Sequence, residues 1–185
     1  MVAAFDSKRA SFMGFCRVLR QIAPLAFAAA ALSACAADQP PEQPSFYASM
    51  ADPSAVVDSN AAASMISGYR QNNGLGAVVV DPDLTRMAQD QARAMAARDK
   101  LDRSAGREFN SRLAGAGFDT RSAAENVGAG YHTLAEAFSG WRDSPPHRAT
   151  MLKAGVNRMG IAAVYAPQSK YKVFWALIMA GRDGA

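Results

Sequence analysis

The spacing of apolar residues along the chain predicts its helices. Between Ser59, a suitable N-cap, and Gly74, a suitable stop, apolar residues recur three and four positions apart. The same spacing marks one side of a second helix, which Asp81 would cap and Pro82 would open. Three shorter helices are expected as well. The first covers about residues 109–116. The second begins at the capping box of Thr133 and Glu136, and the third covers residues 145–152, with Ser144 as its N-cap.

Two strands are expected near the end of the chain, at about residues 158–165 and 171–180. The second reads YKVFWALIMA and is apolar at nearly every position of both faces. Such a strand must be covered on both sides. The pattern therefore predicts a mixed α/β (α+β) fold, a three-layer α-β-α sandwich with helices above and below a central antiparallel sheet.

The N-terminal part of the chain has a different character. Residues 1–34 have the pattern of a signal peptide, because a basic stretch precedes an apolar run at 22–32. That run is shorter than the roughly 20 residues needed to span a bilayer. Met13 is an alternative start to Met1 and would give a leader of more usual length. Residues 35–58 are polar and Pro-rich, which predicts a flexible tether, and residues 59–185 remain for one globular domain.

The segment LSAC at 32–35 resembles the bacterial lipobox. The resemblance implies that the Cys35 thiol is acylated and that Cys35 becomes the first mature residue. The alternative is ordinary cleavage at Ala34 or Ala37, with Cys35 lost or free. Ala36 after the cysteine resembles lipoproteins sorted to the outer membrane. The expected location is therefore outside the cytoplasm, anchored by lipid in the cell envelope at the outer membrane, with the membrane itself as a partner.

Charge and cysteine content narrow the function classes. The chain has 185 residues and a net charge of +4. Residues 1–34 hold four basic residues against one acidic residue, and residues 35–185 hold 16 against 15, so the basic excess lies in the leader. A nucleic-acid partner is therefore not expected, because it would need a basic face on the domain. Cys16 leaves with the leader, so no internal disulfide can stabilise the domain.

Three ordered segments resemble the CAP superfamily, also called the SCP domain, which comprises cysteine-rich secretory proteins, antigen 5 and pathogenesis-related 1 proteins. They are AENVGAG at 124–130, GWRDSPPHRATML at 140–152 and GIAAV at 160–164, within a resemblance that spans about residues 62–181. The resemblance implies an α-β-α sandwich with a central cleft where two His and two Glu can hold a divalent metal. It also implies links to lipid binding, host interaction, cell-wall association and proteolysis.

Only half of the metal-binding set is present. Glu125 and His147 stand where one Glu and one His are expected, whereas Arg103 and Ser144 stand at the other two positions. An arginine cannot ligate a cation. We therefore expect Arg103 to form an ion pair with Glu125, zinc to bind weakly at His147 and Glu125 if at all, and no cofactor to be required.

The remaining cleft candidates are His147 and Asn126. His147 lies in the first turn of its helix, where the helix dipole favours a neutral imidazole suited to base or ligand work. Its structural alternative is a hydrogen bond to Glu125 that locks a loop to the helix. Asn126 could equally be a turn residue that satisfies the backbone. Ser144 is interpreted as a cap and not as a nucleophile.

These observations favour a non-enzymatic binding module that uses a degenerate cleft around Glu125, Asn126, His147 and Arg103. Its ligand would be a lipid, a peptide or peptidoglycan. Two alternatives stay open. One is a metal-assisted hydrolase of envelope peptide or ester bonds, and the other is a structural envelope protein whose role depends on the anchor.

Overall fold

The computed structural model describes residues 43–103 and 108–182. The expected signal peptide and Cys35 lie outside these residues. The helices are a 3₁₀ turn η2 (Ser45–Tyr47), α2 (Ser59–Gln71), α3 (Pro82–Arg98), α4 (Phe109–Ala114), α5 (Leu134–Asp143) and α6 (Pro145–Met151). The strands are β1 (Val79–Val80), β2 (Asp119–Ala129), β3 (Arg158–Tyr165) and β4 (Val173–Gly181). No helix within the described part of the chain is long and apolar enough to cross a membrane.

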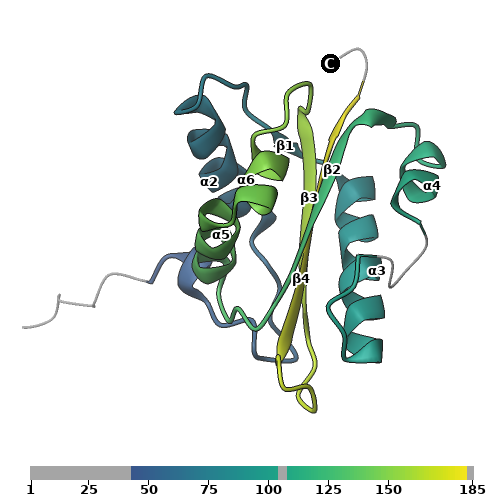
Figure 1. The fold of residues 1–185 in the computed structure, drawn as a ribbon. Coiled ribbons are helices and arrows are strands. Elements are labelled where there is room, and N and C mark those ends of the chain that lie inside the picture. The colour runs from purple at the N-terminus through teal and green to yellow at the C-terminus, as the bar shows by residue number, and fades with distance from the viewer. Residues whose placement is uncertain (1–42, 104–107, 183–185) are drawn as a thin grey trace, which may run out of the picture. The chain divides into compact units, whose positions relative to one another are not determined.

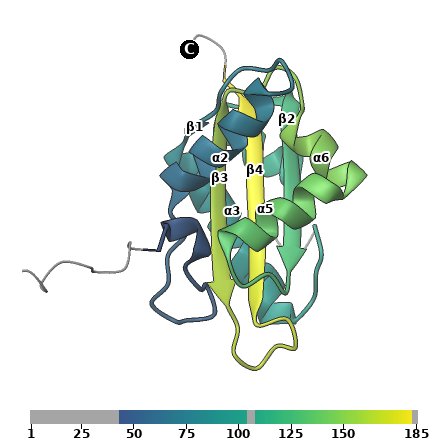
Figure 2. The same cartoon turned by 90° about the vertical axis from the view of Figure 1, so that its left-hand side faces the viewer.

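The strands form one sheet in the order β1-β3-β4-β2. Strand β4 pairs antiparallel with β3 and with β2, whereas β1 pairs parallel with β3. Helices α2, α5 and α6 cover one face of the sheet, and α3 and α4 cover the other (Figures 1 and 2). The three-layer α-β-α sandwich is therefore confirmed. The expected antiparallel sheet needs one correction, which is the short parallel strand at its edge.

Strand β4 explains why both helical layers exist. All nine of its residues are buried. Trp175 and Leu177 belong to the core under α2 and α5, and Phe174 and Ile178 belong to the core under α3. Alternate residues of a strand point to opposite faces, so this one strand supplies side chains to both cores.

The N-caps of α3 and α2 are those expected from the sequence, except that the cap of α2 lies one residue earlier. Asp81 caps α3, accepting from the backbone N–H groups of Asp83 and Leu84, with Pro82 at the first position. For α2 the cap is Asp58 and not Ser59, because the Asp58 carboxylate accepts from two backbone N–H groups of the first turn. A carboxylate next to a hydroxyl is the stronger acceptor of the two.

Part of the expected tether belongs to the domain. Met50 and Val57 are buried in the core on the α2 side. The backbone N–H of Met50 also donates to the carbonyl of His132 at 2.7 Å. The prediction of a flexible tether is therefore wrong for this stretch, since Phe46, Ala51 and Ala55 also pack against the same core.

Candidate functional site

A buried ion pair joins the two elements at the free edge of the sheet. Arg112 comes from α4 and Glu125 from β2, and the Arg112 Nη2 lies 2.8 Å from the Glu125 Oε1. Their side chains are 7% and 4% exposed. The register places Glu125 opposite Ile178 of β4, on the sheet face that α3 and α4 cover. The short helix α4 can therefore present Arg112 directly to the carboxylate.

Burial dominates the protonation of Glu125. Desolvation raises the pKa of the Glu125 carboxyl above its ordinary value of 4.5, and the Arg112 hydrogen bond and charge, followed by the Arg103 charge, oppose this rise without cancelling it. Among the described residues, the short contact with Arg112 thus holds the carboxylate in a poorly solvated place. The chemistry available to it depends on Arg112.

Arg103 lies beside this pair without replacing Arg112. We expected an Arg103–Glu125 ion pair, but in the described part of the chain the ion-pair partner of Glu125 is Arg112. The physical reason is that α4 brings a second guanidinium to the carboxylate. Arg103 instead borders a pocket of about 320 Å³ at the β2 edge. The pocket is lined by Arg103, Glu108, Phe109, Ala124, Glu125 and Thr150.

Asn126 and His147 meet on the other side of the sheet edge. Asn126 lies opposite Leu177 and is fully buried. Its Nδ2 donates to the backbone carbonyl of His147 at 2.9 Å, which fixes the first turn of α6 against β2. Its Oδ1 is buried without a hydrogen-bond partner among the described residues. Asn126 is therefore a strand residue that positions α6, and not a turn residue.

His147 is half-buried, and two effects lower its pKa. Burial is the larger cause and the positive charge of Arg103 is the second. Both favour the neutral imidazole that the sequence predicts, although by causes other than the helix dipole. Ser144 takes the N-cap position of α6 without a side-chain capping bond.

The donor set does not fit a divalent metal. The described residues contain no group of three or more His, Cys, Asp or Glu side chains that could hold an ion. Glu125 already shares its Oε1 with the Arg112 guanidinium. A positive charge in contact with the carboxylate competes with any cation for the same oxygen. The residues present thus favour an ion pair over a metal centre.

Two further polar residues hold the site in place, and the sequence did not reveal them. Gln91 of α3 donates through Nε2 to the carbonyls of Asp102 and Arg103, at 2.8 and 3.0 Å, which fixes the backbone at Arg103. Arg70 of α2 is 1% exposed, and its guanidinium donates to four carbonyls. These belong to Gly76, Met151, Lys153 and Val156. Arg70 thereby secures the C-terminal end of α6.

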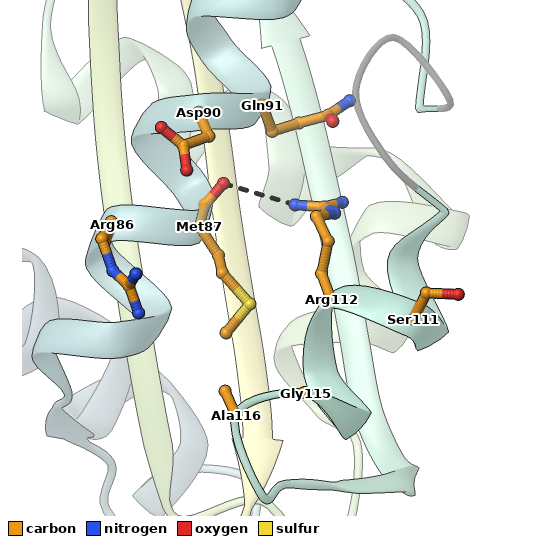
Figure 3. A pocket seen from close by; sticks show the side chains of 8 residues that line it. All are labelled: Arg86, Met87, Asp90, Gln91, Ser111, Arg112, Gly115 and Ala116. Atoms are coloured by element: carbon orange, nitrogen blue, oxygen red, sulfur yellow. Dashed lines mark hydrogen bonds between the residues drawn. The ribbon is translucent and has the colours of Figure 1, made fainter.

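Arg112 also borders a second pocket, between α3 and α4. Figure 3 shows its guanidinium beside the Met87 carbonyl, to which Nη1 donates at 3.3 Å. This pocket measures about 280 Å³. It is lined by Arg86, Met87, Asp90, Gln91, Ser111, Arg112, Gly115 and Ala116. Arg112 therefore lines this pocket and also contacts Glu125, which lines the pocket at the β2 edge.

Comparisons with known proteins agree with this architecture. A cysteine-rich secretory protein from Staphylococcus aureus has 17% identity and a TM-score of 0.54, and the alignment covers 66% of this chain and 38% of that one. An outer surface protein from Borrelia burgdorferi has 15% identity and a TM-score of 0.57, with coverage of 70% and 98%. An extracellular protein with an SCP domain from Bacillus anthracis has 18% identity and a TM-score of 0.56, with coverage of 66% and 40%.

At these identities the structural likeness shows the fold alone. The chain spans less than half of the length of the Staphylococcus and Bacillus proteins and nearly all of the Borrelia protein. Curated proteins give no match to the sequence. Residues 63–179, well over half of the chain, match the model of the cysteine-rich secretory protein family. The chain belongs to this family, the CAP family.

Proposed function

We propose that this chain is an exported CAP-domain protein, attached to the cell envelope through an acylated Cys35, which binds a ligand at the sheet edge without metal chemistry. The lipobox-like LSAC segment supports the anchor. Two of the structurally similar proteins are an outer surface protein and an extracellular protein, which supports export. The proposed ligand is a lipid, a peptide or a peptidoglycan fragment.

The buried Arg112–Glu125 pair is the observation that carries the proposal. It uses the carboxylate that a metal or a water-activating mechanism would need. It also neutralises the charge of Glu125, which leaves Arg103 and Glu108 as the charged residues that line the same pocket. Arginine binds carboxylate and phosphate groups in a bidentate geometry. The proposed ligand therefore presents an anionic group to Arg103.

Thermal unfolding of the leader-free protein tests this function. Envelope phospholipids and soluble peptidoglycan fragments are added separately to the wild type, to Arg103→Gln and to the matched control Arg86→Gln, whose side chain lies on the surface of α3. One of these ligands should raise the melting temperature of the wild type and the control, because it binds only the folded state. Arg103→Gln should lose that increase.

Metal involvement is tested in the same experiment. A chelator should leave the ligand-induced increase unchanged, and calorimetry should detect no tight zinc binding. Stoichiometric zinc at micromolar affinity, or a hydrolytic activity lost both on chelation and in His147→Ala, would contradict the proposal in favour of a metal-assisted hydrolase. An unchanged melting temperature with every ligand, together with loss of cellular function in Cys35→Ser, would favour the purely structural role.

A further inference from the structure

The segment that leads into the domain forms a compact loop. Its two ends are joined by a hydrogen bond of 2.7 Å from Ser45 Oγ to Asp58 Oδ2. Between them Met50 and Val57 are buried, so the loop packs through its own side chains onto the domain. This loop of residues 45–58 is the blue segment beneath α2 in Figure 2. Compact loops with joined ends are frequently functional.

The loop also leaves two large apolar side chains uncovered. Tyr47 is 50% exposed and Val56 is 84% exposed. Each lies two residues along the chain from one of the joined ends. Tyr47 has an apolar ring with a polar hydroxyl, a combination that favours the boundary between membrane and water. The exposed fraction of Val56 is the largest among the exposed large hydrophobic residues of the described chain.

The chain length on the N-terminal side limits what can meet this surface. Only seven residues separate Cys35 from Gln43, where the described domain begins, so eight Cα–Cα steps join the two. Eight steps of a fully extended chain span at most about 28 Å. If Cys35 is acylated, the loop is therefore held within that reach of the bilayer. A short tether also raises the effective concentration of the loop at the membrane surface to about the millimolar range.

We propose that the loop of residues 45–58 docks on the membrane that carries the anchor, with Val56 and Tyr47 entering the lipid interface. This inference rests on the proposed acylation of Cys35. The loop holds Asp52 and Asp58 and no Lys or Arg. Its docking therefore comes from apolar contact and the tether, and it should weaken as the fraction of anionic lipid rises.

Depth-dependent quenching tests the docking on the full acylated chain. Because the acyl chain blocks Cys35, Val56→Cys provides one free thiol for a fluorescent label. Val79→Cys is the matched control, a valine of β1 that is 54% exposed and lies outside the loop. The proteins are reconstituted in vesicles of phosphatidylethanolamine and phosphatidylglycerol that contain a nitroxide lipid. We expect emission at position 56 to fall to about half or less and emission at position 79 to stay unchanged.

Each outcome has a distinct meaning. Failure of the chain to float with the vesicles contradicts the anchor and the docking together. Flotation with no quenching at position 56 leaves the anchor in place and overturns the docking. Equal quenching at both positions overturns it too, because the contact is then not specific to the loop. Shielding of position 56 without vesicles, increasing with protein concentration, assigns the surface to a second copy of the chain instead.

Discussion

Arg112 determines the chemistry of the carboxylate that it contacts. Without this guanidinium, Glu125 would be a buried acid beside a pocket, a natural metal ligand or proton acceptor. With it, the pair is nearly neutral and closed to solvent. A buried pair of this kind gains little stability against an apolar replacement, but losing one partner strands the other charge. Arg112 therefore decides whether the Glu125 carboxylate is paired or available to a metal or a proton.

Replacing Glu125 by Gln should change how stability depends on pH. The folded state raises the pKa of this carboxyl, so the stability that it contributes is present below the ordinary value of 4.5 and is lost as the pH rises through the folded pKa. The free energy of unfolding of the wild type, relative to Glu125→Gln, should fall over that window by about 1.4 kcal/mol for each pH unit of the raised pKa.

Denaturant unfolding at a series of pH values measures this difference. A constant difference between the two proteins from acid to neutral pH would mean that the carboxyl titrates alike in the folded and unfolded states. Because the wild type and Glu125→Gln are compared at the same pH, the contributions of the other acids cancel.

Replacing Arg103 by Gln should raise the pKa of His147. The charge of Arg103 is the second cause of the lowered value, and burial is the first. The pKa should therefore move toward the ordinary 6.5 without reaching it. NMR titration of the His147 ring measures the shift, with Arg86→Gln as the control that leaves it unchanged. An identical titration in Arg103→Gln would show that Arg103 lies too far from the ring to act on it.

The sequence offered Glu125 and His147 as candidate site residues but did not indicate the partner of Glu125. The resemblance to the CAP family points to these two residues, because the matching segments are long and occur in the expected order. Arg112 lies in a six-residue helix with no periodic pattern of its own. Nothing local distinguishes it from a surface arginine. Its role appears only when β2 and α4 are placed next to each other.

At the scale of elements, the close packing of α3 on β3 limits which residue can occupy the contact. Gly160 of β3 lies against the first turn of α3, and a Cβ at this position would come within 2.1 Å of the Leu84 carbonyl carbon. That separation is far shorter than a van der Waals contact, and the atoms that the Cβ would meet belong to the backbone of α3. The helix can therefore approach the sheet this closely only over a glycine.

Gly160→Ala should consequently be strongly destabilising. Either α3 or β3 must shift, and overpacking of this kind costs about 1–3 kcal/mol, with larger values where backbone blocks relaxation. Thermal and denaturant unfolding measure the loss. The control is Gly68→Ala in α2, where a Cβ has nothing within 4 Å and helix propensity should improve. Equal stability of Gly160→Ala and wild type would show that the two elements separate easily.

Two strands were predictable and two were not. The apolar runs of β3 and β4 are long, so the sequence predicted both to within about two residues of their ends. Strand β2 reads DTRSAAENVGA, with small and polar residues and no alternation. Its extended conformation is imposed by pairing with β4 along one edge. Strand β1 has two residues, too few for any pattern to show.

At the scale of the molecule, the domain is larger than the sequence pattern predicts. The loop of residues 45–58 contributes Met50 and Val57 to the core. Removing residues 43–57 while keeping the Asp58 cap should lower the free energy of unfolding by about 3–6 kcal/mol, since each buried side chain contributes about 1.5–3 kcal/mol. Calorimetric unfolding measures this change. Val56→Ala, which alters only an exposed side chain of the same loop, should unfold like the wild type.

An unaltered melting temperature after this truncation would support the sequence-based prediction that the segment is a flexible tether. Such a result would also lengthen the reach of the domain from Cys35 and remove the geometric basis of membrane docking. The stability measurement and the quenching measurement therefore check the same loop independently.

The order of the strands has a consequence for synthesis. Strand β4 lies between β3 and β2, yet it follows both along the chain. Until the ribosome has released residues 173–181, neither neighbour has its main pairing partner, and both hydrophobic layers lack their shared centre. The nascent polypeptide thus stays unfolded through most of translation. Under the proposed export, this delay would keep the chain competent to pass through a secretion channel.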